Sequence, residues 1–302
     1  MISSTKKITD NELLDIITKS TLEIHSSMWL ENIKYNEKKY GFNDTLKGIK
    51  LKSSKTLVIA AGPAFKKVFG KNFQEIMKKR NEITIVACDG ALSMLTDINC
   101  IPDYVVSVDG DPIIANFYKK SKKILRDVIV ILATSINPNV VEECIDAGAK
   151  IKWIQPFFKN NSEEEFFRDG ITSIKMGGNV GTASYILTAF ALKGNPIGLM
   201  GIEFAWSDDT PYSDTQYYNQ LMKSFDKNQE KVGEQFIHVK NPRNGNVYIA
   251  DPVYYAYFLM LKEIWSKLPS EIKNNSYNLT SEGILNIDTL KYIHIKKFLE
   301  LE

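Results

Sequence analysis

The sequence predicts an α/β fold: a Rossmann-like, mainly parallel sheet with helices on both faces, plus helical N- and C-terminal appendages. Two observations predict it. Short apolar runs of strand length recur along the chain, and segments with helical periodicity alternate with them. Several of these runs also end abruptly in glycine, proline or aspartate. Because ligands of open α/β sheets bind where strand ends gather, the same pattern predicts the position of a functional site.

Composition limits the class of protein. The 302 residues are 44% hydrophobic and 25% charged, which is enough for a large core in one domain with appendages. A formal net charge of +2 does not indicate a nucleic-acid partner. The three cysteines, Cys88, Cys100 and Cys144, lack metal-type spacing and are expected to be free thiols in a reducing compartment. No apolar run approaches the roughly 20 residues of a transmembrane helix, so we expect a cytoplasmic protein without a transmembrane segment.

Three regions are expected along the chain. Residues 1–50 carry apolar residues at helical spacing and predict an N-terminal helical appendage, a pair of helices packed on the main domain. Residues 51–240 are expected to form the Rossmann-like, nucleotide-binding catalytic domain. Residues 241–302 are expected to form a C-terminal helical extension packed on the core, ending in a helix over 285–301.

The first strand is predicted at Leu57–Ala61 and stops at Gly62-Pro63-Ala64, before a helix over 66–80. Glycine lets a ligand approach the backbone, and the free N–H groups of a following helix favour an anion. This turn is therefore a candidate phosphate site. An ordinary packing turn between a strand and a helix is the alternative.

Two further strands, at 83–87 and 105–108, each lead into an aspartate followed by glycine. Asp89, with Gly90, suits a hydrogen bond to a ribose or a ring N–H. Asp109 and Asp111 could hold Mg²⁺ through one or two carboxylates, while phosphates and waters complete the octahedron. The alternative for each Asp-Gly pair is a simple turn.

Strands are also predicted at 128–133 and 150–154, separated by a helix over 140–147. This alternation favours parallel pairing through right-handed crossovers. Residues 157–169 are expected to form a mobile connection or a lid-like helix.

A glycine-rich segment then precedes an apolar helix predicted at 185–192. Asn179 or Thr182 could cap that helix, and the turn could cradle a nucleotide or its phosphate. Close packing of helix on sheet is the alternative reason for the glycines. The candidate nucleotide-binding residues of this segment are Gly177, Gly178, Asn179, Gly181 and Thr182.

Candidate catalytic residues come later. Glu203 follows a strand at 196–200, where a carboxylate could bind metal, act as a base or cap its own loop. His238 is a second candidate base because histidine titrates near neutral pH, although a lone histidine is also a common structural residue. Tyr212 could stabilise a departing phosphate. An aromatic helix at 252–267 is expected to cover the sheet or to form a contact between subunits of a homo-oligomer.

Several of these motifs together resemble a known family. AAGPAF, CDGAL with IPDYVVSVDGDP, and GGNVGTAS with GLMGIEFAWSDDTPYSD resemble the domain shared by motility accessory factor (Maf) flagellin glycosyltransferases and archaeal hydroxymethyl-dihydropterin pyrophosphokinases. The resemblance spans about residues 55–215, and the later segments 245–247, 251–265 and 277–283 resemble the Maf branch. A fainter similarity is to bacterial CMP-sialic acid sialyltransferases. Ala64 stands where this family usually has the serine of Gly-Pro-Ser.

The resemblance implies a transferase. The first expectation is a Maf-like glycosyltransferase that moves a sugar, such as a nonulosonic or sialic-type acid, from a nucleotide-activated donor to a hydroxyl of a small-molecule or protein acceptor. The alternative is an ATP-dependent hydroxymethyl-dihydropterin pyrophosphokinase that uses Mg²⁺. A third reading, a nucleotide-binding module without activity, stays open because Ala64 removes a hydroxyl from the first turn.

Overall fold

A computed structural model describes residues 9–157 and 165–301 of the chain. Within these residues, a nine-stranded parallel sheet forms the centre, in the order β12-β11-β7-β1-β2-β3-β4-β5-β6. The α/β fold class predicted from the sequence is confirmed. The strands are β1 (Thr56–Ile59), β2 (Thr84–Cys88), β3 (Tyr104–Ser107), β4 (Ile129–Ala133), β5 (Lys150–Pro156), β6 (Thr172–Ile174), β7 (Ile197–Met200), β11 (Ser276–Asn278) and β12 (Lys291–Tyr292).

The strand order reverses beside β1. The chain adds β2 to β6 on one side of β1 and then returns to place β7 on the other side, with Ile59 paired to Met200. Every residue of β1 and β2 is buried, which is why their sequences are continuous apolar runs rather than alternating ones. In open α/β sheets the crevice outside such a reversal is where ligands bind. The carboxyl ends of β1 and β7 are therefore the first place to look for a site.

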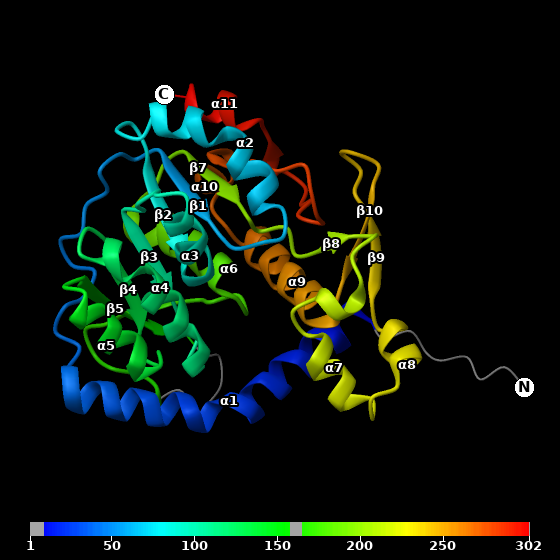
Figure 1. The fold of residues 1–302 in the computed structure, drawn as a ribbon, viewed down its shortest axis with the longest axis horizontal. Coiled ribbons are helices and arrows are strands. Elements are labelled where there is room, and N and C mark those ends of the chain that lie inside the picture. Colours follow the sequence, from blue (N-terminus) through cyan, green and yellow to red (C-terminus); the bar gives the residue numbers. More distant parts are fainter. Residues whose placement is uncertain (1–8, 158–164, 302) are drawn as a thin grey trace, which may run out of the picture.

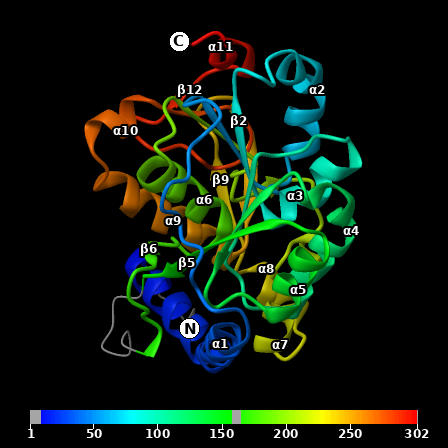
Figure 2. The same cartoon turned by 90° about the vertical axis from the view of Figure 1, so that its left-hand side faces the viewer.

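Helices cover both faces of the sheet (Figures 1 and 2). One face carries α2 (Phe65–Lys78), α3 (Asp89–Asp97), α4 (Ala115–Leu125) and α5 (Pro138–Asp146). The opposite face carries α6 (Val180–Leu187), which contacts β1, β2 and β3 and continues as a π-helical turn over Thr188–Leu192.

The N-terminal region is one helix, so the expectation of a helix pair was wrong. Helix α1 (Asp10–Tyr40) is 31 residues long and begins with a capping box between Thr9 and Glu12. No glycine or proline interrupts residues 10–40, and nothing in the sequence therefore stops the helix. It runs along one end of the sheet, where Asn32 and Asn36 bond to the loops that follow β3 and β4 (Figure 1).

A small unit lies to one side of the main sheet (Figure 1). Its antiparallel sheet contains β8 (Trp206–Ser207), β10 (Val247–Ala250) and β9 (Ile237–Lys240) in that order. A separate apolar cluster of Val232, Phe236 and Ile249 supports it. The remaining helices are η1 (Pro112–Ile114), η4 (Tyr212–Asp214), α7 (Tyr218–Ser224), α8 (Gln229–Gly233), α9 (Pro252–Ser266), α10 (Ser270–Asn274) and α11 (Ile295–Leu299).

The C-terminal segment differs from expectation. Residues 285–301 form β12 and the short α11 instead of one long helix. Thr289 has a positive φ of 73°, which no helix interior accommodates, and the Leu285 carbonyl is bound by Asn278 and Arg243. Strand β11 adds residues 276–278 to the main sheet, where it pairs with β7. The domain boundaries expected at residues 50 and 240 stay a prediction.

Two other expectations concern the connection at 157–169 and the absence of a transmembrane segment. In the segment 157–169, residues 158–164 lie outside the described part of the chain. No helix in the described ranges is long and apolar enough to cross a membrane.

Candidate functional site at the carboxyl edge of the sheet

The turn after β1 packs tightly against the end of β7. The Gly62 amide donates to the Gly201 carbonyl at 2.9 Å, and Phe65 closes the turn by donating to the Gly62 carbonyl at 3.0 Å. A Cβ on Gly62 would lie 1.9 Å from Glu203 Oε2 and 2.4 Å from the Gly201 carbonyl oxygen. Only glycine fits here, so packing by itself explains the residue. Pro63 is exposed and Ala64 is buried, and ligand contact by this turn stays a prediction.

Glu203 is buried beneath that turn and is 1% exposed. Neither carboxylate oxygen has a hydrogen bond of good geometry in the described chain. Burial raises the pKa of Glu203 to about 7, although nearby backbone amides, Ala64 first among them, partly offset the shift. A carboxyl so enclosed does not reach an acceptor in solvent. The expected role of Glu203 as a catalytic base therefore has no support from its position.

Asp89 joins the ends of β2 and β3. One oxygen accepts from the Gly90 amide at 2.7 Å, and the other accepts from the Ser107 hydroxyl at 2.6 Å. Burial raises the pKa of Asp89 to about 6, against these two stabilising hydrogen bonds. Because both oxygens are engaged, Asp89 fixes the shape of this strand edge.

Asp109 and Asp111 follow β3 in a tight turn. Asp109 accepts from the Asp111 amide at 3.0 Å, and Asp111 caps η1 by accepting from the Ile113 amide at 2.8 Å. The Asp109 side chain is exposed, yet the protein around it raises its pKa through desolvation. No group of three potential ligand side chains occurs in residues 9–157 and 165–301. A Mg²⁺ ion held here would need most of its ligands from phosphates and water, as Mg²⁺ commonly has.

The glycine-rich turn brings α6 against α9. Gly177 and Gly178 have positive φ values of 62° and 81°, and a Cβ on Gly178 would lie 2.6 Å from the Tyr257 ring. Asn179 caps α6 by accepting from the Thr182 amide at 2.9 Å, and Thr182 is fully buried. The predicted cap is present. Its nucleotide contacts, like those of Gly181 and the other glycines, stay predictions.

His238 and Tyr212 lie together, which the sequence did not predict. His238 Nε2 is 3.2 Å from the Tyr212 hydroxyl, and His238 Nδ1 is 3.0 Å from Asp208 Oδ1. All three belong to the small antiparallel unit or its loop, and Tyr212 stacks on Phe236 with ring centroids 4.1 Å apart. Since the Asp208 carboxylate can only accept, His238 Nδ1 carries the proton and donates it in this hydrogen bond, which leaves Nε2 as the acceptor nitrogen.

Helices α1 and α9 also supply residues that sequence analysis missed. Asn32 donates to the Gly110 carbonyl at 3.2 Å and to the Ser135 carbonyl at 3.1 Å, and Asn36 donates to the carbonyls that follow β4. Desolvation raises the pKa of Asp109, and His25, which stacks on Trp29 one turn later in α1, acts in the opposite direction. The sequence contained a signal for this contact face, because Asn32 and Asn36 lie four residues apart and therefore on the same side of α1 as the buried Ile33.

Tyrosines of α9 face the loop that carries Tyr212. The hydroxyls of Tyr217 and Tyr257 are 3.0 Å apart, and Tyr254 donates to Gln216 at 2.7 Å. The pKa of both Tyr217 and Tyr257 is raised, mainly by burial and in small part by the charge of Asp109. The aromatic stripe of α9 covers the core, as predicted, and also borders this site.

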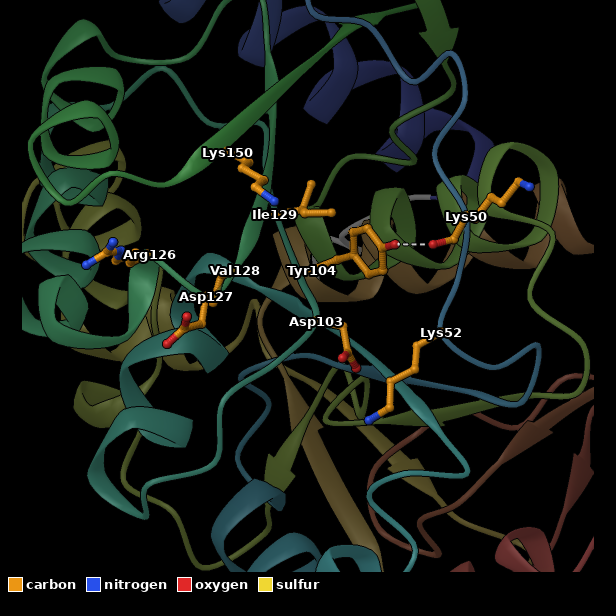
Figure 3. Close-up of a pocket in the computed structure, with 9 residues that line it drawn as sticks. All are labelled: Lys50, Lys52, Asp103, Tyr104, Arg126, Asp127, Val128, Ile129 and Lys150. Carbon is orange, nitrogen blue, oxygen red and sulfur yellow. Dashed lines mark hydrogen bonds between the residues drawn. The ribbon is translucent and has the colours of Figure 1, made fainter.

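A cavity of about 390 Å³ lies at the opposite end of the sheet (Figure 3). It is lined where β3, β4 and β5 begin, by Tyr104, Ile129 and Lys150. The side chains of Lys50 and Arg126 point away from its middle, and Asp103 is already paired with Arg80 at 2.9 Å. Since ligands of this fold class bind at the carboxyl ends of the strands, we place the candidate site there and not in this cavity.

Comparison with known proteins decides the family. Residues 27–209 match the family model described as 6-hydroxymethylpterin diphosphokinase MptE-like. The chain belongs to the MptE-like family. This confirms the resemblance found in the sequence, and the match contains the Gly62 turn, the Asp89 and Asp109 strand ends, the glycine-rich turn and Glu203.

A solved structure shows the same fold as this MptE-like chain. The Maf glycosyltransferase from Magnetospirillum magneticum AMB-1 superposes with a TM-score of 0.63 at 15% sequence identity. The likeness covers 92% of this chain and 39% of that chain, so the MptE-like chain spans well under half of its neighbour. No curated protein has significant sequence similarity to it.

Proposed function

We propose that this MptE-like protein is a glycosyltransferase that moves a sugar from a nucleotide-activated donor to an acceptor hydroxyl. The observation that carries the proposal is the contact chain from Asp208 through His238 to Tyr212. A carboxylate that accepts from one imidazole nitrogen leaves the second nitrogen as an acceptor, and that nitrogen can take the proton which an acceptor hydroxyl must lose as it attacks.

The position of these groups in the chain supports sugar transfer. His238 lies beyond residues 27–209, the span of the family match, while the likeness to the Maf glycosyltransferase covers 92% of the chain. The His238 imidazole is exposed and Tyr212 is half-buried, and in this proposal they serve an acceptor and a leaving phosphate. In this proposal the acceptor hydroxyl replaces the Tyr212 hydroxyl at His238 Nε2, which takes the acceptor proton, and the released Tyr212 hydroxyl donates to a departing phosphate oxygen.

Donor binding is assigned to the carboxyl edge of the main sheet. The Gly62 turn and the segment 177–182 would flank the donor phosphates, and the crevice at the carboxyl end of β1 would hold the nucleoside. A sialic-type sugar is the donor class that the sequence resemblance suggests. Mg²⁺ is an optional partner of the donor phosphates near Asp109.

A second candidate is the diphosphokinase activity that the family description names. Asp109 favours it, because this carboxylate is exposed and accepts from the Asp111 amide through Oδ1, so that Oδ2 could bind a Mg²⁺–ATP complex. Diphosphate transfer would depend on Mg²⁺ and would leave the Asp208–His238–Tyr212 chain without a role.

The test compares ligands and one variant. Melting temperature is measured with CMP, UDP, GDP and ADP, with their sugar derivatives and with ATP, each with and without Mg²⁺, because a ligand of the native state raises it. Sugar transfer is then assayed with the stabilising donor for the native protein and for His238→Ala. We expect a nucleotide sugar to stabilise the protein and His238→Ala to lower kcat by about 10²–10⁴-fold. Stabilisation by ATP with Mg²⁺ alone, with consumption of a pterin alcohol, would establish the second candidate instead.

A further inference from the structure

The cavity at the amino edge of the sheet gathers positive charge from three separate connections of the chain (Figure 3). These connections are the segment before β1, the turn between α4 and β4, and the start of β5. They contribute four cationic side chains to the lining: Lys50, Lys52, Arg126 and Lys150. The cavity has a volume of about 390 Å³, which lies within the range of natural small-molecule sites.

Contacts across the sheet edge hold the three connections together. Tyr104 of β3 is 3% exposed and donates its hydroxyl to the Lys50 carbonyl at 2.8 Å. Arg126 lies beside the turn that leads to Lys150, since a Cβ on Gly148 would be 4.0 Å from Arg126 Cγ. The fold therefore brings these cationic residues to one place, although they come from positions 50 to 150 of the sequence.

The positive charge of the cavity is not neutralised within the chain. Lys120 of the neighbouring α4 does have a partner, since its ammonium group lies 2.7 Å from Asp97. Among residues 9–157 and 165–301, the side chains of Lys50, Arg126 and Lys150 form no ion pair and no hydrogen bond. Three cationic groups without a partner therefore surround one hollow of the surface.

Two acidic residues also line the cavity, but only Asp127 offsets its charge. Asp103 is paired with Arg80 at 2.9 Å and accepts from the Ile85 amide at 2.8 Å, so its charge is already used. The four cations and Asp127 leave a local net charge of +3, whereas the whole chain carries +2. Because the buried Val128 and Tyr104 form an apolar floor, the field of these charges is weakly screened there.

Figure 3 shows how the cationic side chains lie. Lys150 extends toward Ile129, whereas Lys50 and Arg126 turn outward. Like charges repel, and no contact in the described chain fixes the outward positions. An anion in the cavity would draw these long stems inward at the cost of side-chain entropy alone.

A compact ligand with several charged oxygens fits this lining best. Diphosphate has more negative charge than phosphate and presents oxygens in several directions, so it can accept charge-assisted hydrogen bonds from several of the four cations. We propose that the amino-edge cavity is a binding site for a diphosphate group, as the free ion or as part of a nucleoside diphosphate. The inference does not rest on the proposed function, whose ligands lie at the carboxyl edge.

The test measures binding of sodium diphosphate by calorimetry, at constant ionic strength and without divalent cations. The cavity variant combines Lys50→Gln with Lys150→Gln. The control variant combines Lys296→Gln with Lys297→Gln, which removes the same charge from α11. All four lysines are exposed, so both variants should keep the native melting temperature. Titrations with phosphate, AMP and ADP show which part of a ligand is recognised.

We expect the cavity variant to weaken diphosphate binding about tenfold, and the control variant to weaken it less than about twofold. Asp127→Asn should tighten binding about two- to fivefold, because it removes a like charge from the lining. Phosphate and AMP should bind more weakly than diphosphate. A tenfold loss for ADP in the cavity variant would identify a nucleotide as the ligand, whereas a loss confined to diphosphate would identify the free ion.

Two results would overturn the inference. Equal losses in the cavity and control variants would mean that diphosphate responds to overall charge and not to this cavity. Absence of diphosphate binding at about 10 mM would mean that the cavity is not a site. Neither result would bear on sugar transfer, which is assayed separately at the carboxyl edge.

Discussion

The hydroxyl groups of Tyr217 and Tyr257 lie 3.0 Å apart and join the loop of the small antiparallel unit to α9. Both tyrosines are half-buried, and burial raises the pKa of each hydroxyl. We expect Tyr217→Phe and Tyr257→Phe each to lower the free energy of unfolding by about 1 kcal/mol. The double variant should lose less than the sum, with a coupling energy of about 0.5–1 kcal/mol in urea unfolding. Additive losses would mean that the two hydroxyls do not interact.

Glu203 makes stability depend on pH in a known direction. Its pKa is about 7 in the folded protein and 4.5 in the reference state, so the folded state holds more protons between these values. The free energy of unfolding should therefore fall as pH rises from about 4.5 to about 7, by about 3 kcal/mol from this residue, and then level off. Asp89 and Asp251 add falls of the same sign, because burial raises their pKa too.

Glu203→Gln isolates this contribution, since Asp89 and Asp251 are retained in both proteins. The difference in unfolding free energy between variant and native protein should shift in favour of the variant across the same pH interval. Urea unfolding at pH 4.5, 6, 7 and 8.5 measures it. A difference that stays constant with pH would show that Glu203 is not the titrating group.

Gly178 and Gly48 provide a matched pair for close packing. Both have positive φ, 81° and 77°, but a Cβ on Gly178 would strike Tyr257 and Met260 within 2.7 Å, whereas Gly48 has nothing within 4 Å. Gly48→Ala should cost about 1–2 kcal/mol through backbone strain alone. Gly178→Ala should cost about 1–3 kcal/mol more, because α9 must move. Equal shifts in the unfolding midpoint would refute the packing role of Gly178.

Asn36 fastens α1 to the main sheet. Its side-chain nitrogen donates to the Thr134 carbonyl at 3.1 Å and to the Ile136 carbonyl at 2.8 Å, and the residue is fully buried. Asn36→Ala should lower the free energy of unfolding by about 2–4 kcal/mol, because two buried carbonyls lose their donor. The exposed Lys34 serves as control, and Lys34→Ala should change it by less than about 0.5 kcal/mol. Hydrogen exchange in α1 should increase in the first variant only.

Much of the main sheet could be predicted because its signals are local. Continuous apolar runs marked β1, β2 and β3, and Asn179 was recognised as a cap from its place before an apolar helix. Residues 285–301 show the limit: their apolar spacing suited a helix, but pairing of Tyr277 with Lys291 in the main sheet overrode it.

The site was predicted only where its residues follow strands. Strand ends converge by topology, so Gly62, Asp89, Asp109 and Glu203 could be selected from sequence order alone. The approach of His238 to Tyr212 and Asp208 depends on the antiparallel pairing of β10 with β9 and β8, which has no local signal. Burial of Glu203 likewise depends on Gly283, eighty residues later.

Helix α1 imposes an order on the folding of this protein as it is synthesised. At 31 residues it is about 46 Å long, and it leaves the ribosome before any strand that it will touch. The carbonyls that receive Asn32 and Asn36 belong to residues 78 to 103 positions later in the chain. Asn36 cannot form its two hydrogen bonds until the residues after β4 have emerged, so this part of the carboxyl edge is completed by a segment made well before it.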